Sequence, residues 1–125
     1  MIYTQETITP EIENLILESR NQITIDEIET VSVKEIKGKK YIHNDEDKPS
    51  ITCKDGRLYY FKEGLIDRKY GPAIIYPNGM EDYFTSGELN KIIYPDGTYD
   101  EFYKGELLIN SDNDSEDDGF YKPRY

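Results

Sequence analysis

The chain has 125 residues, with 26 acidic and 15 basic side chains and a formal net charge of −11 at neutral pH. This length supports one small domain with a single core, because folding a chain of this size buries roughly two thirds of its extended surface. The negative charge argues against the basic surface of a nucleic-acid-binding protein and against binding to anionic membranes.

Membrane and secretion signals are not predicted. The sequence contains no run of the roughly 20 apolar residues that a spanning helix needs, and residues 1–11 lack the basic and apolar regions of a signal peptide. The lone cysteine, Cys53, agrees with a reducing compartment, because small secreted domains usually carry paired cysteines. We therefore expect a cytoplasmic protein.

Residues 1–36 are predicted to form a cap made of a helix and a strand. A threonine, a proline and a glutamate at positions 9–11 provide the N-cap, first-turn proline and first-turn acid of a helix over residues 10–20. Its apolar stripe is narrow and consists of Ile12, Leu15 and Ile16. We expect this helix to cover one face or end of a sheet.

The stretch 23–36 leaves two interpretations open in its first half. Thr24 and Glu27 have the spacing of a capping box that opens one helical turn. The alternating Val31 and Val33 instead favour a strand that ends at Gly38. We predict a strand for the second half.

Residues 37–110 contain three copies of a strand, turn, strand and turn repeat. Each copy has Asp-Gly or Asn-Gly, a phenylalanine five residues after that glycine and a second glycine eight residues after it. The turn glycines are Gly56, Gly79 and Gly97 at one edge and Gly64, Gly87 and Gly105 at the other. Asp-Gly and Asn-Gly favour two-residue type I′ turns. The predicted fold is mainly β with one N-terminal helix (α+β), as an antiparallel meander of successive β-hairpins in a single sheet.

The sequence also predicts two loops that interrupt the sheet and the positions of its two ends. The glycine spacing is longer between the first and second copies, which places a loop or bulge at residues 67–72. Residues 43–49 form a charged loop. Gly38, with no hairpin partner before it, and residues 107–109 are expected to mark the two ends of the sheet, and an open edge invites pairing with another chain.

Phenylalanine and tyrosine are expected to occupy opposite faces of the sheet. Alternation places Phe61, Phe84 and Phe102 on one face, where they would stack under the helix as a continuous core. The chain has 12 tyrosines, more than a thin core can bury, and tyrosine suits a half-exposed surface. The candidate protein-contact surface consists of Tyr60, Tyr83, Tyr99 and Tyr103.

Catalytic and cofactor chemistry is not predicted. His43 and Cys53 would need to meet across a hairpin to form a dyad, and no third group is evident. Asp114, Glu116, Asp118 and Gly119 imitate the start of a calcium loop, but a closing glutamate is missing. We expect no enzyme, no cofactor and no metal, and residues 111–125 are predicted to be a disordered acidic tail in which Ser115 suits an acidophilic kinase.

One segment resembles a known repeat family. The sequence IDRKYGPAIIYPNG, from Ile66 to Gly79, resembles the signature of MORN-like repeat proteins, with Asp67 at the position of the family histidine. The family includes bacterial proteins described as antitoxin components and many repeat proteins of giant viruses. The resemblance implies a sheet of successive hairpins, a binding or scaffolding role and no catalytic residues. For a viral chain it also implies the host cytoplasm or the virion.

Two functions follow from these features. The first is a non-enzymatic β-repeat module that binds a protein partner or itself, with a homodimer expected and with no nucleic acid or membrane as partner. The alternative is an acidic inhibitor or antitoxin-like protein that blocks a basic partner or mimics nucleic acid, because a strong negative field accelerates association with a basic target.

Overall fold

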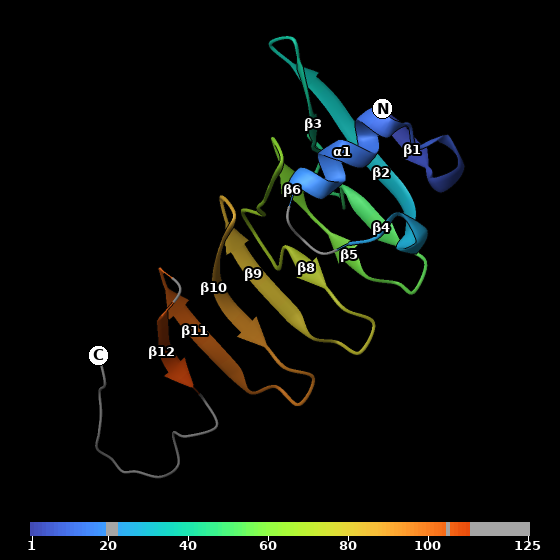
Figure 1. Cartoon of the computed structure of the whole chain (residues 1–125). Coiled ribbons are helices and arrows are strands. Elements are labelled where there is room, and N and C mark those ends of the chain that lie inside the picture. The colour runs from blue at the N-terminus through green and yellow to red at the C-terminus, as the bar shows by residue number, and fades with distance from the viewer. Residues whose placement is uncertain (20–22, 105, 111–125) are drawn as a thin grey trace, which may run out of the picture.

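The computed structural model describes residues 1–19, 23–104 and 106–110, and it is mainly β with one α-helix and a large, open antiparallel sheet (Figure 1). The helical elements are η1 (Gln5–Thr7), α1 (Pro10–Glu18) and η2 (Ile25–Glu27). The strands are β1 (Ile2–Thr4), β2 (Ile28–Ile36), β3 (Lys39–Ile42), β4 (Ile51–Cys53), β5 (Leu58–Tyr59), β6 (Phe61–Lys62), β7 (Leu65–Ile66), β8 (Ile74–Ile75), β9 (Glu81–Thr85), β10 (Glu88–Ile93), β11 (Tyr99–Tyr103) and β12 (Glu106–Asn110). The fold class predicted from the sequence is confirmed.

Helix α1 begins where its capping signals predict. The hydroxyl of Thr9 accepts a hydrogen bond from the backbone N–H of Ile12 at 3.3 Å, and Pro10 occupies the first turn. Ile12 and Ile16 are buried in the core, and Leu15 packs against it. The helix ends at Glu18, close to the predicted end, and its apolar stripe seats it on one face of the sheet.

Both interpretations of residues 23–36 are correct, each for its own half. Thr24 and Glu27 form the capping box of η2, in which the Glu27 carboxylate accepts from the Thr24 N–H at 3.1 Å. Strand β2 follows directly, and Val31 and Val33 are buried.

Within the described residues the large sheet has ten strands, in an order that follows the chain closely. Its path is β1-β2-β4-β5-β8-β9-β10-β11-β12, and β3 pairs with β2 beside this path. Strand β12 is the last strand at one end, as predicted from residues 107–109. The prediction that Gly38 marks the other end is wrong, because Lys37 and Gly38 form the turn between β2 and β3 and the short strand β1 adds an edge beyond β2.

The five predicted turn positions that lie within the described residues are correct, but the type I′ turns are at Gly64 and Gly87 and not at the Asp-Gly and Asn-Gly turns. At each of Gly56, Gly79 and Gly97 only the glycine has a positive φ, and its N–H bonds to the carbonyl three residues back. This is a three-residue loop with a glycine bulge, and Pro77 and Pro95 begin two of these turns. The two-residue turns at Gly64 and Gly87 instead have positive φ at both residues, as type I′ requires. Gly105 lies outside the described residues.

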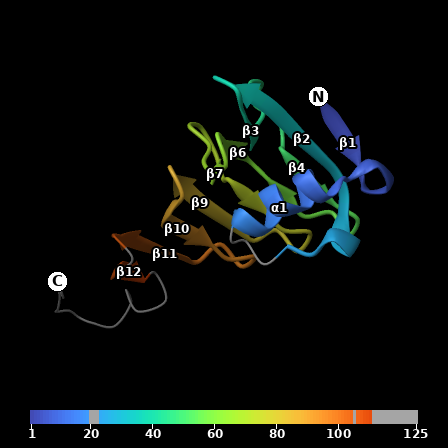
Figure 2. The same ribbon diagram turned by 45° about the horizontal axis from the view of Figure 1, so that its top comes forward.

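The core occupies only the part of the sheet that α1 covers. One row of cross-strand partners begins with the buried residues Val31, Ile51, Tyr59 and Ile74. The same row continues through Asp82, Ile92 and Asp100. We call this side of the sheet the helix face, because α1 contributes Ile12 and Ile16 to the same core (Figure 2).

The predicted continuous phenylalanine column is not formed. Phe61 is buried at 1% exposure and Phe84 packs at the margin of the core, whereas Phe102 is half-exposed and outside it. The chain leaves the large sheet after Tyr59, and β6 pairs with β7 instead. The Ser50 hydroxyl accepts from the Phe61 N–H at 3.1 Å and donates to the Phe61 carbonyl at 3.2 Å, so it replaces strand pairing there.

Gly79→Val is expected to destabilise the domain by about 1–3 kcal/mol, because a β-branched residue resists the φ of +95° that Gly79 adopts. Thermal melting measures the loss. Met80→Val, one residue further along the chain, is the control and is expected to change stability little. Equal stability of the Gly79 variant and the native chain would contradict the hairpin assignment.

The two phenylalanines that contact the core are expected to differ in their contribution to stability. Phe61→Ala should cost roughly 3–5 kcal/mol because it empties a fully buried site, and Phe84→Ala should cost clearly less. Chemical denaturation of both variants gives the two free energies of unfolding. The reverse order would show that the core is centred further along the chain.

Candidate functional site

Three of the four candidate tyrosines share the face opposite α1. Tyr83 alternates along β9 with the helix-face residues Asp82 and Phe84, and Tyr99 and Tyr103 have the same parity in β11. Tyr103 is 61% exposed. The structure therefore brings Tyr83, Tyr99 and Tyr103 to one side of the sheet.

The fourth candidate, Tyr60, is not on this surface. It is buried at 8% exposure, where the chain leaves β5, and its backbone N–H bonds to the Ala73 carbonyl at 2.7 Å. The Arg68 guanidinium lies 3.9 Å from the centre of its ring. Simple alternation misplaces Tyr60 because the strand that it would continue ends at Tyr59.

Lys91 lies between the two half-buried tyrosines. Its Nζ is 5.7 Å from the ring centre of Tyr83 and 5.4 Å from that of Tyr99. It also lies 3.9 Å from a carboxylate oxygen of Glu101. The Tyr83 hydroxyl donates to Glu81 at 3.1 Å, and burial, together with this hydrogen bond, raises the pKa of Tyr83. The aromatic rings are thus held in place by opposite charges on adjacent strands.

An aliphatic row extends this aromatic cluster across the sheet. Successive cross-strand partners on the face opposite α1 are Thr30, Thr52, Leu58, Ile75, Glu81, Ile93 and Tyr99. All of them are partly exposed. We call the surface formed by Leu58, Ile75, Ile93, Lys91, Tyr83, Tyr99 and Tyr103 the tyrosine face. No helix in the described part of the chain covers it (Figure 1).

The sequence reasoning missed a tyrosine–aspartate pair in each of the last two repeats. The Tyr76 hydroxyl donates to Asp82 at 2.8 Å, and the Tyr94 hydroxyl donates to Asp100 at 2.7 Å. Both pairs have the same spacing, and the second follows the first by one repeat, so the repeat alignment contains the signal. Each pair ties the strand before a turn to the strand after it.

Arg68 has a structural role in the segment that resembles the MORN-like signature. Its Nε and Nη2 donate to the Asp47 carboxylate at 2.8 and 3.1 Å, and Nη1 donates to the Pro72 carbonyl at 3.1 Å. Gly71 has a φ of +136°, and a Cβ there would lie 3.1 Å from the guanidinium. The arginine and the glycine thus pin the predicted 67–72 loop to the charged 43–49 loop.

His43 and Cys53 do not form a dyad. The His43 Nδ1 accepts from the Glu63 N–H at 2.9 Å, and Nε2 lies 2.8 Å from the Asp45 carboxylate. Burial raises the pKa of the Cys53 thiol to about 11, which keeps it protonated and unreactive near neutral pH. His43 is thus held by hydrogen bonds and Cys53 is buried in the core, so both residues have structural roles.

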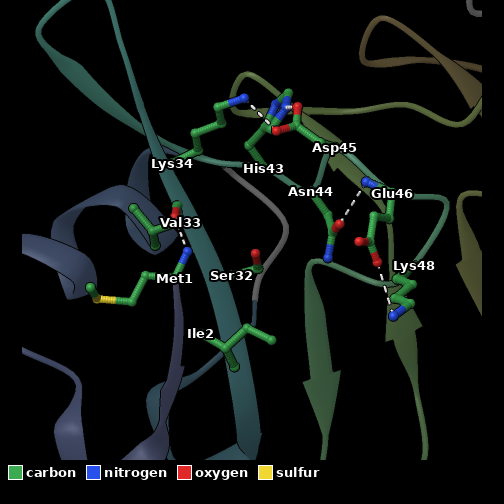
Figure 3. A pocket seen from close by; sticks show the side chains of 10 residues that line it. All are labelled: Met1, Ile2, Ser32, Val33, Lys34, His43, Asn44, Asp45, Glu46 and Lys48. Atoms are coloured by element: carbon green, nitrogen blue, oxygen red, sulfur yellow. Dashed lines mark hydrogen bonds and ion pairs between the residues drawn. The ribbon is translucent and has the colours of Figure 1, made fainter.

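A cavity of about 410 Å³ lies beside His43 (Figure 3). Its charged lining residues are already paired, because Lys34 bonds to Asp45 and Lys48 bonds to Glu46. Hydrogen bonds from Lys34 and then His43 lower the pKa of Asp45 to about 2. Among the described residues no three histidine, cysteine or acidic side chains are placed to hold a metal ion.

Residues 111–125, predicted to be an acidic tail that includes Ser115 and the residues that imitate a calcium loop, lie outside the described residues. None of the helices in the described part of the chain is long and apolar enough to span a bilayer.

Comparison with known proteins gave no match to a family model, a curated protein or a solved structure. The MORN-like resemblance therefore stays a hypothesis based on residues 66–79.

Asp82→Asn is expected to stabilise the protein at neutral pH by on the order of 1 kcal/mol. Burial raises the pKa of the Asp82 carboxyl, and its Oδ1 is buried without a hydrogen-bond donor from the described residues. Because the pKa of Asp82 is higher in the folded state than in the unfolded state, its protonated carboxyl stabilises the fold below the unfolded-state pKa. This contribution is lost as the pH rises through the folded-state pKa. The stability gained by Asp82→Asn should therefore shrink as the pH is lowered toward about 4.

Denaturation at several pH values measures this difference. Asp100→Asn, which changes the equivalent and less buried carboxylate of the next repeat, is the matched control and should gain less. Destabilisation by Asp82→Asn at every pH would mean that the carboxylate is required in its charged form.

Proposed function

We propose that this chain is a non-enzymatic protein-binding module that associates with itself through the tyrosine face. One observation carries the proposal: on the face opposite α1, a row of partly exposed side chains crosses the sheet, and from Leu58 to Tyr99 all its members except Glu81 are aliphatic or aromatic. Large apolar surfaces of this kind usually mark contacts with other proteins. Tyrosine is favoured in such contacts because it combines a large apolar ring with a polar end.

The charges on this surface suit a second copy of the chain. A net charge of −11 makes two copies repel each other. On the tyrosine face, however, Lys91 lies between the rings and beside Glu101, so it offsets part of the negative charge of Glu81 and Glu101. A like-charged copy therefore meets less repulsion at this surface than the net charge alone implies, and the row of side chains across the sheet offers an extended contact area.

The double variant Tyr83→Ser with Tyr103→Ser is expected to convert the dimer to monomer. Both changes remove aromatic contact area, and since neither side chain is in the core, the stability of the monomer should change by no more than about 1–2 kcal/mol. Light scattering across a concentration series gives the mass, and thermal melting reports folding.

Tyr70→Ser is the matched control, because Tyr70 is 77% exposed and lies in the 67–72 loop. It should leave association unchanged. A native chain that stays monomeric at every concentration would refute self-association, and a double variant that dimerises like the native chain would refute this surface.

A further inference from the structure

The second and third hairpins of the large sheet repeat with a period of 18 residues. Ile74 pairs with Asp82, and Ile92 pairs with Asp100 in the equivalent register. Asp100 in turn pairs with Asn110 of β12, which stands 18 residues after Ile92. Figure 1 shows β12 at the end of the sheet, and the described residues contribute no strand to its other side. Strand β12 therefore lies where a further hairpin of the repeat would begin.

The sequence after β12 matches the preceding repeat at the same spacing. Residues 96–104 read DGTYDEFYK, and residues 114–122, which follow 18 positions later, read DSEDDGFYK. Five of the nine positions agree without a gap, namely Asp114, Asp118, Phe120, Tyr121 and Lys122. Because the agreement includes two aromatic residues and a lysine, it reflects the repeat and not only the acidic composition of this segment.

One of the shared residues is the side chain that begins each turn. In the earlier copies this side chain accepts a hydrogen bond from the backbone N–H two residues further on, at 3.0 Å for Asp55, 2.9 Å for Asn78 and 3.0 Å for Asp96. Asp114 stands at the same position of the further copy. Since such turns are formed by local contacts, Asp114 is suited to start a turn between β12 and a following strand.

We propose that residues 117–121 bind the free edge of β12 as a further antiparallel strand, in the register of the earlier hairpins. Asp118 then pairs with Asn110 as Asp100 pairs with Ile92. By alternation Phe120 continues the helix face and Tyr121 continues the tyrosine face. The added strand covers an edge that is otherwise open to an extended segment of another chain. This contact goes beyond the proposed self-association, because it uses the edge of the sheet.

Two residue differences make this hairpin weaker than the earlier ones. Ser115 replaces the turn glycine Gly97, whose φ is +92°, and a serine resists such a φ. Asp112 replaces Tyr94, whose hydroxyl bonds to the aspartate of its own hairpin. Asp112 and Asp118 instead repel each other across the pair. The further strand therefore opens more readily than its neighbours, and it acts as a removable cover of the β12 edge.

Amide hydrogen exchange of the full chain, resolved by NMR and corrected for intrinsic rates, tests the pairing. The N–H groups of Tyr76 and Tyr94 bond across their turns at 3.0 and 2.8 Å, and Asp112 has the equivalent position. The Asp112 amide should therefore be protected from exchange. Ser115→Gly should increase this protection on the order of tenfold, because it removes one strained backbone position. Ser111→Gly, in the same segment and outside the turn, is the matched control and should not increase it.

A second pair of variants tests the side-chain match. Asp112→Tyr restores the tyrosine of the earlier copies and should increase the protection of the β12 amides. Asn113→Tyr places the same ring at the position of Pro95, one residue further on, and should not increase it. All samples are measured at a concentration at which light scattering gives the mass of a monomer. Failure of the edge pairing is thereby distinguished from failure of the proposed self-association.

Three results would overturn the proposal. An Asp112 amide that exchanges at its intrinsic rate in both the native chain and the Ser115→Gly variant would show that the segment does not pair, in agreement with the disordered tail expected from its charge. Equal protection in Ser115→Gly and Ser111→Gly would remove the argument from the turn. Protection that appears only as the protein concentration rises would mean that the segment pairs with β12 of a second copy.

Discussion

The structure depends on one constraint: within the described residues, a single nine-residue helix covers only part of one face of a ten-stranded sheet. Ile12 and Ile16 share one hydrophobic core with the buried part of the helix-face row, from Val31 to Ile74. Further along, the same row consists of Asp82, Ile92 and Asp100, so two carboxylates face the helix side of the sheet. The hydroxyls of Tyr76 and Tyr94 then stabilise these carboxylates by hydrogen bonding. The row thus changes from apolar residues only to apolar residues that alternate with carboxylates.

The tyrosine face, on the other side of the sheet, has a different composition from the helix face. Within the described residues no helix packs there, yet Leu58 and Ile75 are neighbours across the sheet, and Ile93 and Tyr99 follow after Glu81. Such a surface is too apolar to be explained by strand formation alone. We therefore assign a second copy of the chain to this face.

Local signals in the sequence predicted most elements, and long-range contacts account for the errors. The capping residues Thr9 and Thr24 fix where α1 and η2 begin, and the repeated glycines mark turns, because these preferences act within a few residues. The large sheet loses the chain after Tyr59 because the Ser50 hydroxyl hydrogen-bonds to both the N–H and the carbonyl of Phe61. Ser50 is eleven residues away in the sequence, so no local sequence pattern predicts this contact. Tyr60 was therefore misassigned, whereas Tyr83, Tyr99 and Tyr103 lie in regular strands and were placed on one face correctly.

The central claim is that the tyrosine face becomes buried when the protein associates. Hydroxyl-radical footprinting of the native chain at low and high protein concentration tests it directly, because it reports the solvent accessibility of individual side chains. We expect Tyr83 and Tyr103 to become protected as the concentration rises while Tyr70, which is 77% exposed in a loop, stays reactive. Unchanged reactivity of Tyr83 and Tyr103 in a sample that light scattering shows to be dimeric would contradict it.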